Sequence, residues 1–227
     1  MGNIVKIGKY WNGVYDAFHS TPKRTRMSVW NEKPTPFFTS LMDFLKHENV
    51  KTIMDAGCGD GRNIKPYLEA GFHVIGVDAS SSALAICRKY FGNNPNLKLL
   101  QGDITTVELS RGLDAVMCDH VLTHIKNVDG ALANFYRLLR KGGYGLIEFT
   151  SPFDSTYSIG KKLSDREFLQ KGVYLRYDDV PGVYRMMKPF KILCFTSEHS
   201  TDPSHGSGYI REKRHRHHSY FVLAKKE

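Results

Sequence analysis

Residues 53–62, with the sequence IMDAGCGDGR, constrain the fold more than any other part of this chain. The apolar run that leads into them predicts a buried strand over residues 52–56, and the segment that follows predicts a helix to about Glu69. The glycines in between allow a sharp turn and leave no Cβ between the backbone and a ligand. A second apolar run at residues 73–77 completes a βαβ unit, whose connection implies parallel strands.

The same alternation of strand-like and helix-like segments continues to the C-terminus. Further strands are predicted at residues 97–101, 113–118, 144–149, 190–195 and 219–224, and further helices at 35–45, 80–92 and 128–139. The pattern predicts an α/β fold, a single doubly wound Rossmann-like domain with a seven-stranded, mostly parallel sheet and a final antiparallel strand. A length of 227 residues, 41% of them hydrophobic and 24% charged, suits one folded domain.

Two acidic side chains and the glycine spacing narrow the choice of ligand. Asp78 follows the second strand and is placed to accept hydrogen bonds from both hydroxyls of a ribose. The spacing G-x-G-x-G departs from the G-x-G-x-x-G of dinucleotide-binding folds, so the third glycine is misplaced for a pyrophosphate. Asp55, at the tip of the first strand, would repel a phosphate but can bind the ammonium of a methionine moiety. We therefore expect an adenosine-type cofactor with a zwitterionic tail.

With this loop the chain resembles the class I S-adenosylmethionine-dependent methyltransferases, which carry D-x-G-x-G-x-G after their first strand. The resemblance covers about residues 37–150, including Asp78, the GDI at residues 102–104 and the LLRKGG at 138–143. It implies S-adenosylmethionine as cofactor and S-adenosylhomocysteine as product. Beyond Asp55 and Asp78, the expected cofactor contacts are Gly57, Cys58 and Gly59 in the loop, Ala79 and Ser80 beside adenine and ribose, Asp103 and Ile104 at the adenine, and Asp119 and His120 at the methionine end.

The N-terminal aromatic residues resemble the cover of small-molecule methyltransferases in the tellurite-resistance and thiopurine group. They are Tyr10, Trp11, Tyr15 and Trp30, followed by residues 34–38. This likeness divides the chain into an arm over residues 1–34 that covers the active site and a methyltransferase domain over residues 35–227. It also implies that Trp30 closes over the methionine end.

The acceptor site is expected at the same edge of the sheet as the cofactor, because the segments after the fourth, fifth and sixth strands end there. These segments are residues 119–126, a lid-like insertion at 150–177 and an acceptor-side loop at 199–217. A sulfonium already activates its methyl group, so the protein mainly has to hold the nucleophile in line and exclude water. If the acceptor is a hydroxyl or a protonated amine, His120 or His124 is the candidate base. A thiolate needs no base.

The histidine-rich end of the chain raises the possibility of a metal site. Its histidines are His199, His205, His215, His217 and His218. No spacing among them matches a known structural site, and strand alternation puts His217 and His218 on opposite faces. We therefore expect no metal, and interpret the segment as a solvated basic loop or, for one or two histidines, as part of a polar acceptor pocket.

A net charge of +9 leaves the class of acceptor open. The positive residues are spread out except near the C-terminus, which favours transfer of a methyl group to an O, N or S nucleophile of a small molecule. The alternatives are an RNA methyltransferase, indicated by the basic run at residues 211–216, and a non-catalytic S-adenosylmethionine-binding protein. A nicotinamide-dependent oxidoreductase fits the loop less well. The oligomeric state stays open.

Cysteine usage and the N-terminus indicate the compartment. The four cysteines, at positions 58, 87, 118 and 194, form no C-x-x-C pair and indicate reduced thiols. The N-terminus lacks the apolar core of a signal peptide, and no membrane span is visible. We expect a cytoplasmic protein with no membrane partner.

Overall fold

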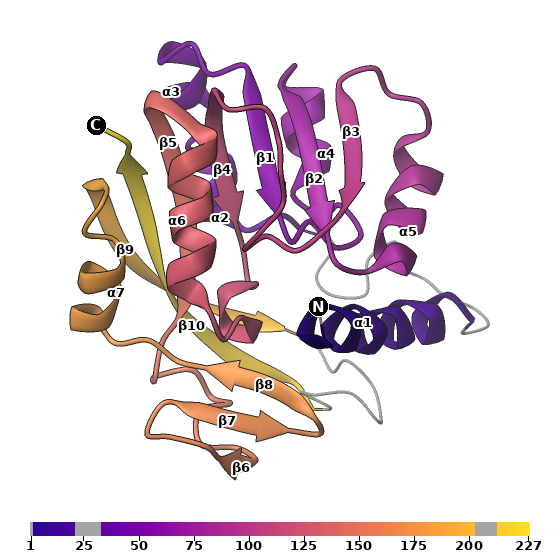
Figure 1. Ribbon diagram of the computed structural model, residues 1–227, viewed down its shortest axis with the longest axis vertical. Coiled ribbons are helices and arrows are strands. Elements are labelled where there is room, and N and C mark those ends of the chain that lie inside the picture. The colour runs from indigo at the N-terminus through magenta and orange to yellow at the C-terminus, as the bar shows by residue number, and fades with distance from the viewer. Residues whose placement is uncertain (1, 21–32, 203–212) are drawn as a thin grey trace.

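A seven-stranded sheet runs through the middle of the molecule (Figure 1), in a computed structural model that describes residues 2–20, 33–202 and 213–227. Its strands, in spatial order, are β3 (Leu97–Gln101), β2 (His73–Asp78), β1 (Thr52–Ala56), β4 (Leu113–Cys118), β5 (Leu139–Thr150), β10 (His215–Lys225) and β9 (Lys191–Asp202). The first five pair in parallel, and β10 runs antiparallel between β5 and β9. The predicted fold class is confirmed.

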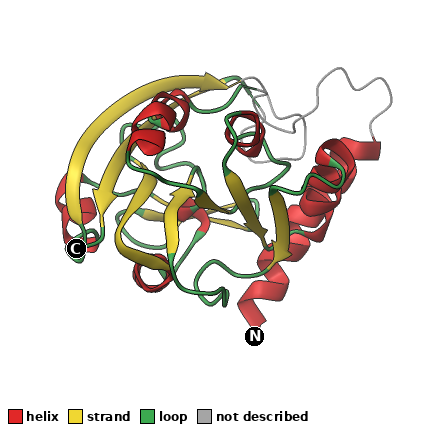
Figure 2. Cartoon of the chain, turned by 90° about the horizontal axis from the view of Figure 1, so that it is seen from above, coloured by secondary structure: helices red, strands yellow, loops and turns green. Residues whose placement is uncertain are grey.

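Helices cover both faces of this sheet (Figure 2). One face carries α2 (Pro36–Ser40), α3 (Met42–His47), α4 (Ile64–Glu69) and α5 (Ser81–Phe91), and the other carries α6 (Val128–Leu138) and α7 (Val180–Met186). Successive strand residues point to opposite faces, so Ile53 packs with the first group of helices and Met54 with the second. Both side chains are almost fully buried, as expected for a strand covered on both sides.

The helix starts follow the sequence with one exception. Ser80 caps α5 by accepting a hydrogen bond from the Ala83 amide at 3.1 Å, as predicted. The predicted helix at residues 35–45 is instead broken at Leu41 into α2 and α3. Thr35 precedes it but makes no side-chain capping bond, because its hydroxyl donates to the carboxylate of Asp119. A residue that the sequence assigns to a helix end thus belongs to the site described below.

The order of the strands locates the site. From β1 the chain moves outward to β2 and β3, and then crosses to β4 on the other side of β1. The carboxyl ends of β1, β2 and β4 therefore meet where the strand order reverses, which is where α/β sheets of this kind bind ligands. The helix α1 (Gly2–Ser20) lies across this edge (Figure 1).

The C-terminal part differs from its prediction in two ways. The last two strands are longer than expected, so His199 lies on β9, and the expected acceptor-side loop of residues 199–217 shrinks to the connection between Asp202 and His215. The insertion at residues 150–177 contains a second sheet of β6 (Lys161–Lys162), β7 (Glu167–Gln170) and β8 (Val173–Arg176). This sheet is held to the short helical turn η1 (Leu122–His124) by the Thr123 hydroxyl, which donates to the Arg176 carbonyl at 2.9 Å.

Asp114 fastens three strands at the opposite, amino edge of the sheet. Its carboxylate accepts the amides of Lys51 and Thr52, each at 2.9 Å, and Arg140 Nε at 2.6 Å. Burial raises the pKa of Asp114, but the Arg140 guanidinium and the two amides outweigh it and hold the pKa below its usual value. The ionised carboxylate therefore stabilises the fold above its unfolded-state pKa.

We predict that Asp114→Ala lowers the free energy of unfolding by about 1–3 kcal/mol at pH 7, because charged hydrogen bonds are lost. The stabilisation by Asp114 disappears as the pH falls through about 4 and below, where the carboxylate is protonated in both states. Urea unfolding followed by circular dichroism at pH 7 and at acid pH measures both effects. An equal difference between wild type and variant at the two pH values would contradict the assigned role of the charge.

Candidate active site

The glycine loop after β1 folds tightly against the end of β2. The amides of Gly57 and Cys58 both donate to the Val77 carbonyl, at 2.7 and 3.1 Å, and the Gly59 amide donates to Asp78 Oδ2 at 2.8 Å. Gly57 has φ +81°, and a Cβ there would lie 2.3 Å from a methyl carbon of Val121. The turn therefore excludes a side chain at this position for both conformational and steric reasons.

The helix α1 lies across this loop and is fastened by Asn12. Asn12 Oδ1 accepts the Ser80 hydroxyl at 2.8 Å and the Ser82 amide at 3.2 Å, at the start of α5. A Cβ on Gly59, where φ is +54°, would lie 2.6 Å from the Tyr15 hydroxyl. The described part of the N-terminal segment, α1, therefore contacts the glycine loop. Sequence reasoning missed Asn12, because one asparagine within a helical pattern carries no signal of a distant partner.

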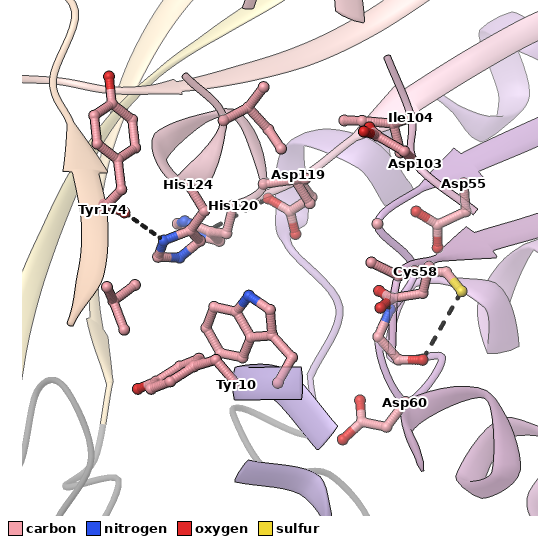
Figure 3. Close-up of a pocket in the computed structure, with 18 of the residues that line it drawn as sticks. Tyr10, Asp55, Cys58, Asp60, Asp103, Ile104, Asp119, His120, His124 and Tyr174 are labelled. Atoms are coloured by element: carbon pink, nitrogen blue, oxygen red, sulfur yellow. Dashed lines mark hydrogen bonds and ion pairs between the residues drawn. The ribbon is translucent and has the colours of Figure 1, made fainter. Parts of the chain in front are cut away.

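A cavity of about 690 Å³ opens between the carboxyl edge of the sheet, α1 and β8 (Figure 3). Its wall brings together nearly all the expected site residues, namely Asp55, Gly57, Cys58, Gly59, Asp78, Ala79, Asp103, Ile104, Asp119, His120 and His124. Ser80 is fully buried and is not part of the wall. Trp30 lies outside the described residues, and the aromatic side chains of Tyr10 and Trp11 from α1 form part of the wall instead.

Asp55 is a buried carboxyl at the tip of β1. Desolvation, strengthened by the nearby carboxylates of Asp119 and Asp78, raises its pKa to about 8. Without a ligand, Asp55 is therefore mostly protonated at neutral pH. A cation placed beside it would favour its ionised form, so this part of the wall is suited to a positively charged group.

Asp119, at the end of β4, is the most heavily bonded acid of the site. Its Oδ2 accepts the Thr35 hydroxyl and Arg62, each at 2.7 Å, and Asn63 Nδ2 at 2.9 Å. Its Oδ1 is buried and has no hydrogen-bond partner among the described residues. Burial raises the pKa of Asp119, but His120 and Arg62 hold it below its usual value, so the carboxylate is ionised.

The partners of Asp119 show what the sequence signals missed. Arg62 and Asn63 follow directly after the glycine loop, and only this position in the sequence could have indicated that they belong to the site. Thr35 was predicted to be a helix cap. These polar groups become partners of one carboxylate only because α2, the loop and β4 meet in space, which no local pattern reveals.

His120 lies between two buried carboxylates. Its Nδ1 lies 3.6 Å from Glu148 Oε1 on β5, and its Nε2 lies 3.9 Å from Asp119 Oδ1. Its backbone has φ +55°, an uncommon conformation for histidine, and its amide donates to Glu148 Oε2 at 3.1 Å.

His124 lies next to β8. Its Nδ1 donates to the Tyr174 carbonyl at 3.2 Å, since a carbonyl can only accept, and this leaves Nε2 as the basic nitrogen. The indole of Trp11 packs edge-on against the imidazole with 5.0 Å between ring centroids. Both expected catalytic histidines therefore line one cavity but lie in different environments.

The residues of this cavity fit S-adenosylmethionine. The volume suits a ligand of that size together with a small acceptor. The unpartnered Asp119 Oδ1 and the buried Asp55 carboxyl provide negative charge for an ammonium or a sulfonium. The positive φ of Gly59 and its bare Cα present peptide groups to a ligand without a side chain.

Comparison with known proteins agrees with the geometry. Residues 54–147 match the family described as the methyltransferase domain. A ubiquinone biosynthesis O-methyltransferase from Rickettsia akari is 28% identical over 116 residues, which are 51% of this chain and 46% of that protein. The chain thus spans about half the length of the curated relatives it matches.

Two solved structures illustrate the shared fold. One, described as the conversion of a disulfide bond into a thioacetal group during echinomycin biosynthesis, has a TM-score of 0.72 and 14% identity, and the match covers 97% of this chain and 93% of that one. The other, the glycopeptide N-methyltransferase MtfA complexed with S-adenosylmethionine, has a TM-score of 0.57 and 18% identity, covering 83% and 94%. Residues 54–147 of this chain thus match the methyltransferase domain family, and the strand order and the cavity at the carboxyl edge agree with the fold of S-adenosylmethionine-dependent methyltransferases.

Proposed function

We propose that this protein transfers the methyl group of S-adenosylmethionine to a nucleophilic atom of a small molecule by in-line displacement. One observation carries the proposal. A single cavity joins the expected cofactor residues at one end to His120, His124 and Tyr174 at the other, so cofactor and acceptor have room side by side. Holding two reactants in one geometry and away from water accounts for much of the catalysis that such a reaction needs.

The cofactor contacts follow from the layout of the wall. Asp78 is proposed to bind the ribose, with Ala79 beside it, and Asp103 and Ile104 the adenine. Asp55 and Asp119 are proposed to face the charged methionine end, where the loop residues Gly57, Cys58 and Gly59 offer peptide groups. Ser80 supports this arrangement from within the protein by capping α5 and bonding Asn12. Trp30 stays an expectation about the cover.

S-adenosylmethionine, when bound, supplies a methyl group that its sulfonium has already activated. The chain's own task is then to orient the nucleophile, exclude water and accept a proton where the acceptor carries one. His120 is the better-placed base, because its Nε2 lies 3.9 Å from the ionised carboxylate of Asp119, which provides a counter-charge when the ring takes up a proton. His124 is the second candidate. We infer that α1 and the sheet of β6, β7 and β8 act as the cover and the lid.

The charge of the cavity wall favours a small molecule over RNA. Six aspartates line it, against one arginine and one lysine; the aspartates are Asp55, Asp60, Asp78, Asp103, Asp119 and Asp202. Such a wall repels a phosphate backbone, although the whole chain carries +9. The basic run behind the RNA alternative falls partly outside the described residues. None of the described helices is long and apolar enough to cross a membrane.

The proposal is tested by incubating the protein with S-adenosylmethionine and a panel of phenols, amines, thiols and carboxylates. Formation of S-adenosylhomocysteine that depends on one acceptor class supports it. Methylation of RNA with a steep salt dependence would support the runner-up instead. Cofactor binding without turnover across the panel would favour a non-catalytic binding protein.

Asp78→Ala is expected to weaken binding of S-adenosylmethionine by about 1–3 kcal/mol, through lost charged hydrogen bonds. Isothermal titration calorimetry measures the change. The matched control is Asp114→Ala, which removes an aspartate from the other edge of the sheet and should leave affinity unchanged while lowering stability. Unchanged affinity in Asp78→Ala would contradict the ribose assignment.

The pKa of Asp55 near 8 predicts a pH-dependent affinity. Below that pH the carboxyl is protonated in the empty protein, whereas a bound cation favours its ionised form. Binding therefore releases a proton, and the affinity rises with pH by up to about tenfold per pH unit. Calorimetry between about pH 6 and 7.5, in buffers of different ionisation enthalpy, measures how many protons are released when S-adenosylmethionine binds.

The same experiment on Asp55→Asn provides the comparison. This variant should bind more weakly near neutral pH and lose the proton release, because the amide does not titrate. Asp43→Asn, on the exposed part of α3, should behave like the wild type. A proton release that persists in Asp55→Asn would assign the titration to another group.

His120→Gln is expected to lower kcat about 100-fold for a hydroxyl acceptor, since a positioned base contributes on this scale. For a thiol acceptor that reacts as a thiolate, the loss should be less than tenfold. His73→Gln, exposed at the start of β2, is the control. An equal loss for both acceptors would show that His120 positions the cavity wall rather than taking up a proton.

A further inference from the structure

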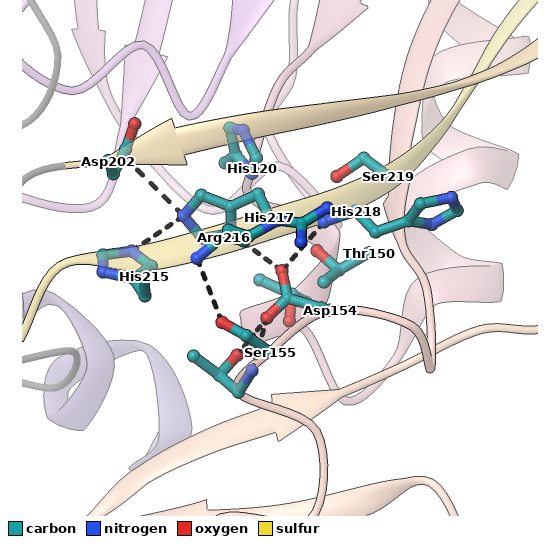
Figure 4. A network of polar contacts seen from close by, with 12 residues as sticks. His120, Thr150, Asp154, Ser155, Asp202, His215, Arg216, His217, His218 and Ser219 are labelled. Carbon is teal, nitrogen blue, oxygen red and sulfur yellow. Dashed lines mark hydrogen bonds and ion pairs between the residues drawn. The ribbon is translucent and has the colours of Figure 1, made fainter.

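A cluster of two histidines and one aspartate lies at the ends of β9 and β10 (Figure 4). Asp202 and His215 are directly opposite each other on the two antiparallel strands, and His217 follows two residues later on the same face of β10. His215 Nε2 lies 2.9 Å from His217 Nε2, which lies 3.7 Å from Asp202 Oδ2. One donor atom from each residue falls within 4.8 Å of the others.

The outer nitrogen of each imidazole is held by a hydrogen bond that determines the tautomer. His215 Nδ1 donates to the Lys213 carbonyl at 2.9 Å. His217 Nδ1 donates to Asp154 Oδ2 at 2.8 Å, and Asp154 is itself buried and held by the Thr156 amide at 2.8 Å. Protons on both Nδ1 atoms leave lone pairs on both Nε2 atoms, which point at each other. Two lone pairs at 2.9 Å repel unless they share a cation.

This arrangement has the features of a transition-metal site. Two donors that are each bound about 2.0–2.1 Å from a metal, at angles of 90–110°, lie about 2.9–3.4 Å apart, as the two Nε2 atoms nearly do. Ligating histidines usually donate their other nitrogen to a carboxylate or a carbonyl, as both do here. Two imidazoles and one carboxylate suit divalent zinc or iron better than magnesium or calcium, which prefer oxygen ligands.

The cluster forms part of the wall of the active-site cavity. Asp202 and His217 line the cavity together with His120, whose ring centroid lies 5.1 Å from that of His217. The neighbouring carboxylates of Asp119 and Asp154 add negative charge, and the guanidinium of Arg62 bonds to Asp119. Among the described residues the cluster offers three ligands, the number that catalytic metal sites use beside an exchangeable position.

We propose that Asp202, His215 and His217 bind one divalent transition-metal ion of the zinc or iron type at the acceptor end of the cavity. In a refinement that rests on the proposed function, the ion orients an acceptor through an oxygen ligand, such as a hydroxyl or a carboxylate.

This proposal replaces the expectation of no metal. That expectation rested on His217 and His218 pointing to opposite faces of the strand. Their environments do differ: His217 lines the cavity, whereas His218 bonds to Ser151. The pair that matters is His215 and His217, with a partner from the neighbouring strand.

The test uses full-length, tag-free protein that has been stripped with a chelator and dialysed. Calorimetry with Zn²⁺, and visible absorption with Co²⁺, should each show one ion per chain, with no competition from Mg²⁺. His217→Ala and Asp202→Ala should each weaken Zn²⁺ binding by at least about 100-fold. Asp154→Asn, which changes a hydrogen-bond partner of His217 but no proposed ligand, should weaken Zn²⁺ binding by about 10–100-fold.

The chain offers a matched control on the opposite face of the same strands. His199 pairs directly with His218, with 4.4 Å between ring centroids, and His199 is exposed. His199→Ala should therefore leave Zn²⁺ affinity unchanged. Thermal unfolding of each variant shows whether it folds. If a variant does not fold, the Co²⁺ spectrum of the wild type tests the proposal instead: nitrogen-ligand character supports the site, and its absence contradicts it.

The proposal is overturned if the wild type takes up no more Zn²⁺ than His215→Ala and His217→Ala, because the two imidazoles then share a proton rather than a metal. It is equally overturned if His199→Ala has the same effect as His217→Ala. S-adenosylmethionine binding is measured on the same samples. A protein that binds S-adenosylmethionine but takes up no Zn²⁺ rejects this inference alone. A protein that takes up Zn²⁺ but does not bind S-adenosylmethionine rejects the proposed function alone.

Discussion

Buried negative charge at the carboxyl edge of the sheet is the constraint on which the rest of the site depends. The parallel strands β1, β2 and β4 each have an aspartate at or next to their last residue, and the strand order brings these ends together. Burial of several carboxylates is unfavourable unless cations or hydrogen-bond donors approach them. Asp119 has Arg62, Asn63 and Thr35, whereas Asp55 stays protonated. The cavity is therefore poised for a cationic ligand before any ligand arrives.

The helix α1, which lies across this edge of the sheet, contacts the turns that follow β1 and β2. Asn12 of α1 bonds the first turn of α5, next to the Asp78 loop that is proposed to hold the ribose. Tyr15 lies against the bare backbone of Gly59. Contacts that order the cofactor loop thus also order the helix above it. Binding of the cofactor and placement of α1 should be energetically coupled, since both use the turn between Asp78 and Ser82.

The end of the cavity that is proposed to hold the acceptor is built from segments that lie far apart in sequence. The η1 turn supplies His124, the small sheet supplies Tyr174, and the long β9–β10 pair brings Asp202 and His217 to the same wall. Their polar groups are held by backbone carbonyls and by buried acids such as Asp154. Rigid support of this kind is what precise positioning of an acceptor requires. A metal ion at the histidine cluster would extend the support to the acceptor itself.

The fold, and the gathering of most expected cofactor residues along one cavity, were predictable because they depend on local patterns. The glycine loop needs backbone conformations that glycine provides, and strand periodicity indicates which residues face a core, so Asp55, Asp78 and Asp103 could be placed at strand ends from the sequence alone. The contacts between segments that lie far apart in sequence were not predictable to the same degree. Thr35 looked like a helix cap, and Asn12 looked like an ordinary helix residue.

Tertiary structure alone decided how the distant segments meet. Strand alternation correctly separates His217 from His218, yet the partnership of His215 and His217 with Asp202 depends on the register between β9 and β10 and on where those strands end. Register is set by pairing across the sheet and by the packing of its buried face. A single chain read in order contains the residues of such a cluster but not the distances between them, because those distances are properties of the assembled sheet.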